Sequence, residues 1–90
     1  IHCVGLGSGS FSQINKNAGN NGARIPTIHE LVDIHALYGN RWPMGNGNYW
    51  SSTVSSAGIG GWNWYYVKNM VTGGNFKLKS HNASLGVGIR

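Results

Sequence analysis

Residues 24–40, RIPTIHELVDIHALYGN, carry the clearest secondary-structure signal in this chain of 90 residues. Thr27 and Glu30 have the T-x-x-E spacing of a capping box, in which the hydroxyl and the carboxylate each accept a hydrogen bond from a backbone N–H at the helix start. From Leu31 onward, apolar residues recur with helical spacing. Gly39 is a typical C-terminal stop. We therefore predict a helix that begins after Thr27 and ends at Gly39.

The only two acidic residues, Glu30 and Asp33, both fall in this helix, against seven Lys and Arg and a formal net charge of +5. Acidic residues near a helix N-terminus are stabilising, so we interpret the pair as helix-stabilising rather than catalytic. A calcium site built from several carboxylates needs more acids than the chain has. The basic residues are spread along the sequence, which favours solvated surface charge. An anionic partner is the alternative.

Beyond Gly39 the pattern becomes strand-like. We predict four short strands joined by long loops rich in Gly and Asn, at residues 48–53, 62–69, 75–80 and 84–90. A short helix at 13–18 precedes the main helix, and we expect residues 1–9 to form a flexible lead-in. Ninety residues make a single domain. The predicted class is α+β, with one or two helices packed on a short, twisted antiparallel sheet.

Alternation along the strands assigns their faces, because successive side chains point to opposite sides. On one face of the second predicted strand we place Trp62, Trp64 and Tyr66, and on the other Asn63, Tyr65 and Val67. In the third strand the apolar residues Phe76 and Leu78 are expected to point inward. The lysines that alternate with them then point into solvent. In the last strand we place on a single face Leu85, Val87 and Ile89.

Residues suited to catalysis or metal binding lack the required spacing. His29 and His35 are six residues apart in the predicted helix, whereas a zinc pair on one helix needs three or four. Serines are plentiful, but no G-x-S-x-G motif accompanies them. Cys3 is the single cysteine and cannot form a disulfide within the chain. We therefore expect no enzyme, no metal and no cofactor.

Aromatic residues beside Asn and Gly provide the candidate binding surface. Trp and Tyr give a large contact area at low entropic cost, which suits protein or sugar recognition. Trp42 and Trp62 stand at the ends of long loops, and we predict that they are exposed anchors, with burial as the equal alternative. The candidate binding residues are Arg41, Trp42, Asn46, Asn48, Trp62, Asn63 and Tyr65, with Lys77 and Lys79 adding electrostatic attraction. Alternating aromatic and basic residues also suit single-stranded nucleic acid, which we rank lower.

Two motifs, GARIPTIHEL at residues 22–31 and YWSST at 49–53, are followed by WYYV and a closing VGIR. This order resembles the C-type-lectin-like C-terminal domains of invasin- and intimin-like bacterial surface adhesins, over roughly residues 10–90. The resemblance implies a compact lectin-like domain beyond a stack of immunoglobulin-like domains, with both motifs serving as scaffold. Relatives often have two cysteines where this chain has Ala18 and Gly88, so their disulfide is missing.

The resemblance implies a non-enzymatic adhesion module that is exported and displayed at the bacterial cell surface. Its partners would be a protein or glycan on another cell and the remainder of its own longer chain. The sequence begins IHCVGLGSGS without an initiator Met and has no apolar run long enough to insert into a membrane. We therefore expect a fragment of a larger protein. The alternatives are a structural cap that ends the stalk and a binder of anionic polymers.

Overall fold

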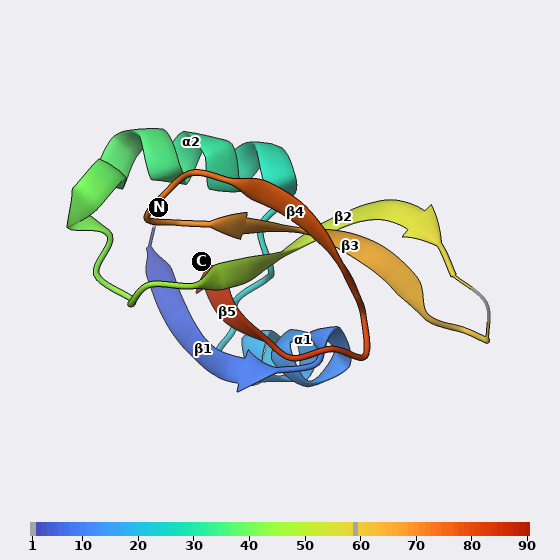
Figure 1. Cartoon of the computed structure of the whole chain (residues 1–90). Coiled ribbons are helices and arrows are strands. Elements are labelled where there is room, and N and C mark those ends of the chain that lie inside the picture. Colours follow the sequence, from blue (N-terminus) through green and yellow to red (C-terminus); the bar gives the residue numbers. More distant parts are fainter. Residues whose placement is uncertain (1, 59) are drawn as a thin grey trace.

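The computed structural model describes residues 2–58 and 60–90, which contain two helices and five strands (Figure 1). They follow one another in the order β1 (Cys3–Gly9), α1 (Phe11–Asn20), α2 (Ile28–Tyr38), β2 (Asn48–Ala57), β3 (Asn63–Asn69), β4 (Asn75–Lys79) and β5 (Ser84–Ile89). A short 3-10 turn, Gly39–Arg41, follows α2. The predicted α+β class is therefore confirmed.

The sheet has the strand order β1-β5-β2-β3-β4. Three of its neighbouring pairs are antiparallel, but β2 and β5 are parallel and meet through Tyr49 and Leu85. The prediction of a wholly antiparallel sheet is therefore wrong. The loop at residues 80–83 crosses to α1, where Phe11 N donates to Ser80 O at 3.0 Å. The chain then enters the sheet between β1 and β2 rather than turning back beside β4.

The N-terminal segment forms strand β1, so the prediction of a flexible lead-in is wrong for Cys3–Gly9. This strand pairs with β5 from Cys3 opposite Ile89 to Gly9 opposite Ser84, and its Leu6 is buried. The register shifts between Gly5 and Ser8, and Gly7 has a φ of 77°. This irregularity interrupts the alternation by which strands are recognised in a sequence.

The two helices cover opposite faces of the sheet, with α2 at the top of Figure 1 and α1 at the bottom. Tyr49 and Trp50 are neighbours in β2 and therefore point to opposite faces. Tyr49 packs in one core cluster with Leu31 of α2, whereas Trp50 packs in a second cluster with Ile14 of α1. The domain thus has two small cores, one on each side of the sheet.

Strand β5 separates its large and small residues between these two cores. Its apolar side chains pack in the α2 core, as predicted: Leu85, Val87 and Ile89. Gly86 faces α1, where an added Cβ would overlap the side chain of Ile14. The absence of a side chain at Gly86 therefore lets helix α1 approach the centre of the sheet closely.

The capping box of α2 forms as predicted. Thr27 N donates to Glu30 Oε1 at 2.9 Å, and Glu30 N donates to Thr27 Oγ1 at 3.2 Å. Helix α1 begins earlier than predicted, because Ser10 forms a second capping box with Gln13. The S-x-x-Q signal of that box is present in the sequence at residues 10–13.

The two motifs that carry the family resemblance contact each other. Ser52 N donates to Pro26 O at 2.8 Å, and Ile28 N donates to Thr53 Oγ1 at 3.0 Å. Ser51 is fully buried and donates from Oγ to Tyr66 O at 2.6 Å. The Thr53 hydroxyl and the Ser52 backbone N–H thus fasten the start of α2 to the sheet, and the Ser51 hydroxyl joins β2 to β3.

Strand β4 lies at the edge of the sheet and buries less than predicted. Leu78 packs partly buried against the α1 core. Phe76, however, is 54% exposed, so the expectation that it points into the core is wrong. Phe76 pairs with Val67 next to the Gly73–Gly74 turn, and as an edge residue it has a neighbouring strand on one side alone.

Candidate functional site

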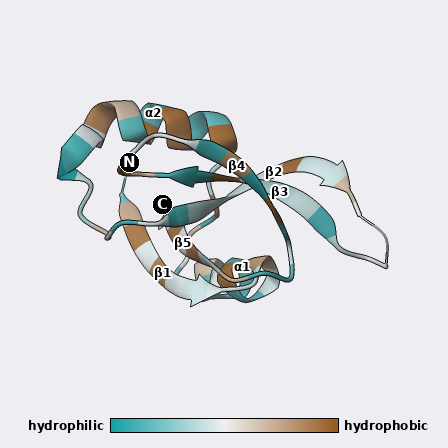
Figure 2. Ribbon diagram, viewed as in Figure 1, coloured by the Kyte–Doolittle hydropathy of each residue, from teal (hydrophilic) through white to brown (hydrophobic). Residues whose placement is uncertain are grey.

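The β2–β3 hairpin projects beyond the two helices (Figure 1), and its outer end is mainly white to teal in Figure 2. Strands β3 and β4 pair with Trp64 opposite Lys79 and Tyr66 opposite Lys77. Residues directly opposite each other share a face of the sheet. The aromatic and basic side chains therefore gather on one surface, which we call the Trp–Lys face: Trp62, Trp64, Lys77 and Lys79.

The lysine ammonium groups of this face lie over the tryptophan rings. Lys77 Nζ is 5.6 Å from the ring centroid of Trp64, and Lys79 Nζ lies 5.3 Å from Trp62 and 5.4 Å from Trp64. These distances are within the range of cation–π attraction. The two indoles meet edge to face with their ring centroids 5.7 Å apart. The ring centroid of His81 lies 5.5 Å from that of Trp62. The rings remain partly exposed in a defined arrangement.

No acidic residue balances the charge of the Trp–Lys face within residues 2–58 and 60–90. The acids Glu30 and Asp33 both lie in α2, and Glu30 is engaged by Arg24 in a 2.6 Å ion pair. The positive potential of the two β4 lysines, Lys77 and Lys79, is therefore not neutralised, and it attracts anionic groups on a partner.

A glycine before Trp62 determines where its indole can lie. Gly58 N donates to Trp62 O at 2.9 Å, and a Cβ at Gly58 would overlap the indole ring. Gly60 and Gly61 have φ angles of 79° and 88°, in the left-handed region that glycine adopts without strain. The glycines therefore allow the turn that packs Trp62 against the end of the hairpin.

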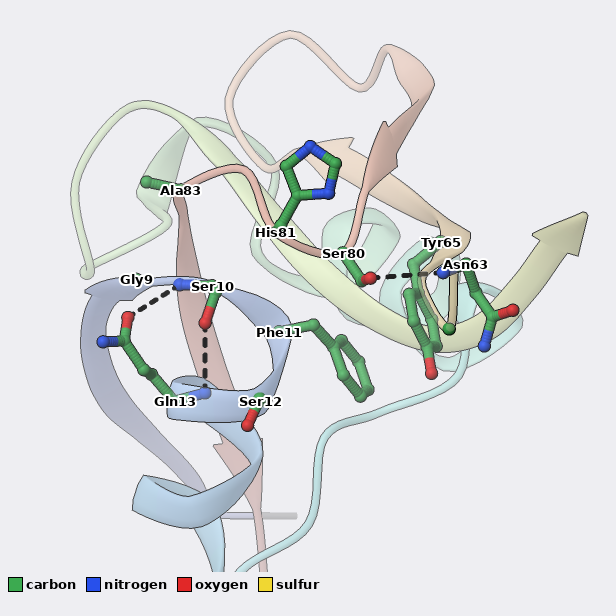
Figure 3. Close-up of a pocket in the computed structure, with 11 residues that line it drawn as sticks. Gly9, Ser10, Phe11, Ser12, Gln13, Asn63, Tyr65, Ser80, His81 and Ala83 are labelled. Carbon is green, nitrogen blue, oxygen red and sulfur yellow. Dashed lines mark hydrogen bonds between the residues drawn. The ribbon is translucent and has the colours of Figure 1, made fainter. Parts of the chain in front are cut away.

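The opposite face of β3 contributes to a hollow of about 630 Å³ (Figure 3). Gly9 and the first residues of α1 form one side, and the loop after β4 forms the other. The side chains that give the hollow its chemistry are Phe11, Ser12, Gln13, Asn63, Tyr65 and His81. We call it the Phe11 hollow. The predicted residues Asn63 and Tyr65 lie here, on the other side of the hairpin from Lys77 and Lys79.

The floor of the Phe11 hollow is an aromatic stack. Phe11 and Tyr65 are nearly parallel, with ring centroids 3.8 Å apart and an interplanar angle of 7°. Trp50 meets both rings edge to face, and its Nε1 donates to Gly9 O at 3.0 Å. The stack is thereby joined to the α1 core.

The other predicted binding loop does not join these surfaces. Trp42 is only 7% exposed and packs between Tyr38 and Tyr49, so its prediction as an exposed anchor is wrong and the burial alternative is correct. Its Nε1 is buried without a hydrogen-bond partner among the described residues. The indole fills the core at the end of α2, a tertiary position that loop composition does not specify.

The remaining residues of that loop, Arg41, Asn46 and Asn48, are exposed. Asn48 begins β2, whereas the other end of β2 pairs with Asn63. The ends of a ten-residue strand can lie as much as about 30 Å apart. The predicted residues therefore occupy separate regions, and they do not form a single site.

Trp64, His81 and Phe11 were not predicted as binding residues. The sequence indicates the strand face or loop in which each one lies, but their proximity depends on the β3–β4 register and on the crossover from β4 to β5. Buried Lys68 was also missed. Its Nζ donates to Gly73 O and Asn75 Oδ1 at 2.9 and 3.0 Å, and burial lowers its pKa. This lysine closes the β3–β4 turn.

The described residues contain no group of three or more His, Cys, Asp or Glu side chains that could hold a metal ion. Cys3 is half-buried and has no disulfide partner, and burial raises the pKa of its thiol. A raised pKa leaves less of the reactive thiolate at neutral pH. The arrangement thus offers surfaces for stacking, hydrogen bonding and charge attraction.

Neither helix in the described parts of the chain has the length and apolar character needed to cross a membrane.

The motifs at residues 22–31 and 49–53 have a clear structural role, and the exposed aromatic surfaces lie elsewhere. Comparison with known proteins found no matching family model, no matching curated protein and no matching solved structure.

Proposed function

We propose that this domain is a non-enzymatic recognition module of a bacterial surface adhesin. It binds a protein or glycan on another cell, and the Trp–Lys face makes the contact. The observation that carries this proposal is the cluster of partly exposed Trp62 and Trp64 beneath Lys77 and Lys79. Tryptophans at the centre of an interface often supply most of the binding energy.

The position of the family motifs supports the same proposal. We also propose that this α+β domain has a C-type-lectin-like fold, in which these motifs serve as scaffold. Tyr49 and Trp50 are buried, and Ser51 and Thr53 bond to neighbouring backbone. Recognition would then fall to loops and hairpin ends. We further propose that the domain is exported and displayed on the cell surface as part of a longer chain.

The interleaving of lysine and tryptophan also favours a second candidate function, the binding of an anionic polymer. The two functions differ in their response to salt. Binding dominated by phosphate or sulfate contacts falls steeply with added salt because counterions are released. A contact dominated by tryptophan burial is less sensitive to salt.

The proposal is tested by binding the labelled domain to intact bacterial and animal cells at two salt concentrations. We expect saturable binding that survives the higher salt and that falls about tenfold in Trp64→Ala. Phe76→Ala is the matched control, because Phe76 is an exposed aromatic on the opposite face of the paired strands β3 and β4. Circular dichroism verifies that both variants are folded.

Three results would contradict the proposal. Equal losses in Trp64→Ala and Phe76→Ala would remove the Trp–Lys face as the binding surface. Binding that moderate salt abolishes would favour an anionic polymer as the partner. If the folded wild-type domain bound no cell type, the structural cap would become the better account.

A further inference from the structure

We propose that the Phe11 hollow binds one uncharged sugar residue, held against the Phe11–Tyr65 stack. The inference rests on the proposed function, since it names the chemistry of a partner glycan. It concerns a separate surface from the Trp–Lys face, because Tyr65 and Trp64 point to opposite sides of β3.

The aromatic floor suits the apolar C–H face of a sugar ring. Phe11 and Tyr65 stack at 3.8 Å, and Trp50 supports both rings edge to face. A supported stack is already ordered before a ligand arrives, which reduces the entropy lost on binding. Pockets for small ligands commonly combine such aromatic surface with a few convergent polar groups.

The polar groups around this floor are available to a ligand. Figure 3 shows the side-chain amide of Asn63, the Tyr65 hydroxyl and the Ser12 hydroxyl around the stack, without a hydrogen bond to the other residues drawn. The hydrogen bond drawn at Asn63 joins its backbone N–H to Ser80 Oγ. His81 stands across the hollow on the loop after β4. An amide and a hydroxyl can each donate and accept, as the hydroxyls of a sugar require.

The hollow has no feature that would select a charged ligand. No Lys, Arg, Asp or Glu is among its described lining residues. The start of α1 does not provide an anion site, because Phe11 N donates to Ser80 O and Gln13 N donates to Ser10 Oγ. Gln13 Oε1 in turn accepts from Ser10 N. Neutral hydrogen-bonding groups therefore dominate the surface.

The size of the hollow, about 630 Å³, falls within the range of small-molecule sites. The hollow is open to solvent rather than enclosed. A single sugar residue bound there would therefore leave much of its surface exposed. We therefore expect a weak site, with a Kd of about 1 mM. His81 also contacts Trp62 of the Trp–Lys face, so a longer glycan that passes His81 would reach both surfaces.

The test is a titration of the ¹⁵N-labelled domain with free glucose, galactose, mannose or N-acetylglucosamine, followed by NMR. We expect at least one sugar to give saturable shifts in the amides of Phe11, Ser12, Asn63 and His81. Asn63→Ala and Ser12→Ala should each weaken this binding about three- to tenfold, the loss expected for one hydrogen bond. Asn20→Ala, which removes an exposed Asn at the end of α1 and outside the hollow, should leave sugar binding unchanged.

The inference is overturned if none of the four neutral sugars gives saturable shifts, or if glucose 6-sulfate alone does so. It is also overturned if the two hollow variants bind as the wild type does while their spectra remain folded. The titration uses no cells, so its result is independent of the adhesion test. Sugar shifts without cell binding would support the hollow and contradict adhesion, whereas cell binding without sugar shifts would overturn the hollow alone.

Discussion

Glu30 shows how one side chain can connect three parts of a small domain. Its carboxylate accepts from both terminal nitrogens of Arg24, at 2.7 and 2.6 Å, and from Thr27 N at 2.9 Å. The Arg24 guanidinium, followed by the bond from Thr27 N, lowers the pKa of Glu30 to about 2. Arg24 also pairs through its backbone with Ile89 of β5. The carboxylate thus joins the start of α2 to the segment that precedes it.

The lowered pKa predicts a pH-dependent stability. A carboxyl group whose pKa is lower in the folded state stabilises the protein above the unfolded pKa, and this contribution is lost as the pH falls through the folded value. We expect the wild-type free energy of unfolding to decline between about pH 5 and pH 2 partly through Glu30. Glu30→Gln should lower the free energy of unfolding by about 1 kcal/mol at pH 7, because the variant loses the charged interactions of the carboxylate. The loss is small because the Arg24–Glu30 pair is exposed to solvent.

Urea unfolding at a series of pH values measures this effect, with Asp33→Asn as a control that removes the other acid of α2. The Glu30→Gln domain should show a flatter decline at low pH than the wild type. An unchanged slope in Glu30→Gln would show that the Arg24–Glu30 pair does not stabilise the folded state.

At the scale of elements, the pairing of β1 with β5 brings the two ends of the described chain together. His2 N donates to Arg90 O at 3.2 Å, and Arg90 N donates to His2 O at 3.0 Å. Strand β5 meets β2 at a single residue pair, so most of its backbone partners are in β1. Without β1, the strand that supports both helices would lose one edge.

We predict that deletion of residues 1–9 strongly destabilises the domain. The deletion exposes the edge of β5 and removes Leu6, whose burial alone is worth about 2 kcal/mol. The expected fall in Tm is more than about 10 °C. Thermal unfolding by circular dichroism measures it, and Lys16→Ala on α1 is a surface control. A truncated domain with an unchanged Tm would contradict the role of β1.

For the molecule as a whole, local signals predicted elements better than their arrangement. The capping box and apolar spacing predicted α2, and alternation predicted the strand faces and the grouping of Lys77 with Lys79. Strand β1 was missed because its irregular, glycine-rich register hides the alternation. The parallel contact between β2 and β5 depends on a crossover, which no local pattern in the sequence specifies.

Only part of the candidate site could be predicted, because the proximity of its residues also depends on the arrangement of the elements. The β3–β4 register places Trp64 opposite Lys79, and Lys79 Nζ then also lies over the ring of Trp62. Trp42 occurs in a similar sequence context of Gly and Asn, yet it is buried beside Tyr49. Burial of a loop tryptophan depends on packing between distant segments. The Phe11 hollow likewise needs α1, β3 and the loop after β4 to be assembled.

The central claim is that the Trp–Lys face recognises a partner, and its lysines allow the most direct test. The measurement is the binding isotherm of Lys77→Ala/Lys79→Ala on intact cells. It is compared with Lys16→Ala/Arg41→Ala, which removes the same amount of charge elsewhere and includes a predicted residue of the other loop. Circular dichroism verifies that both double variants are folded. We predict about a tenfold loss of affinity in the first double variant and little change in the second. Equal losses, or a loss in the second variant alone, would contradict recognition by this face.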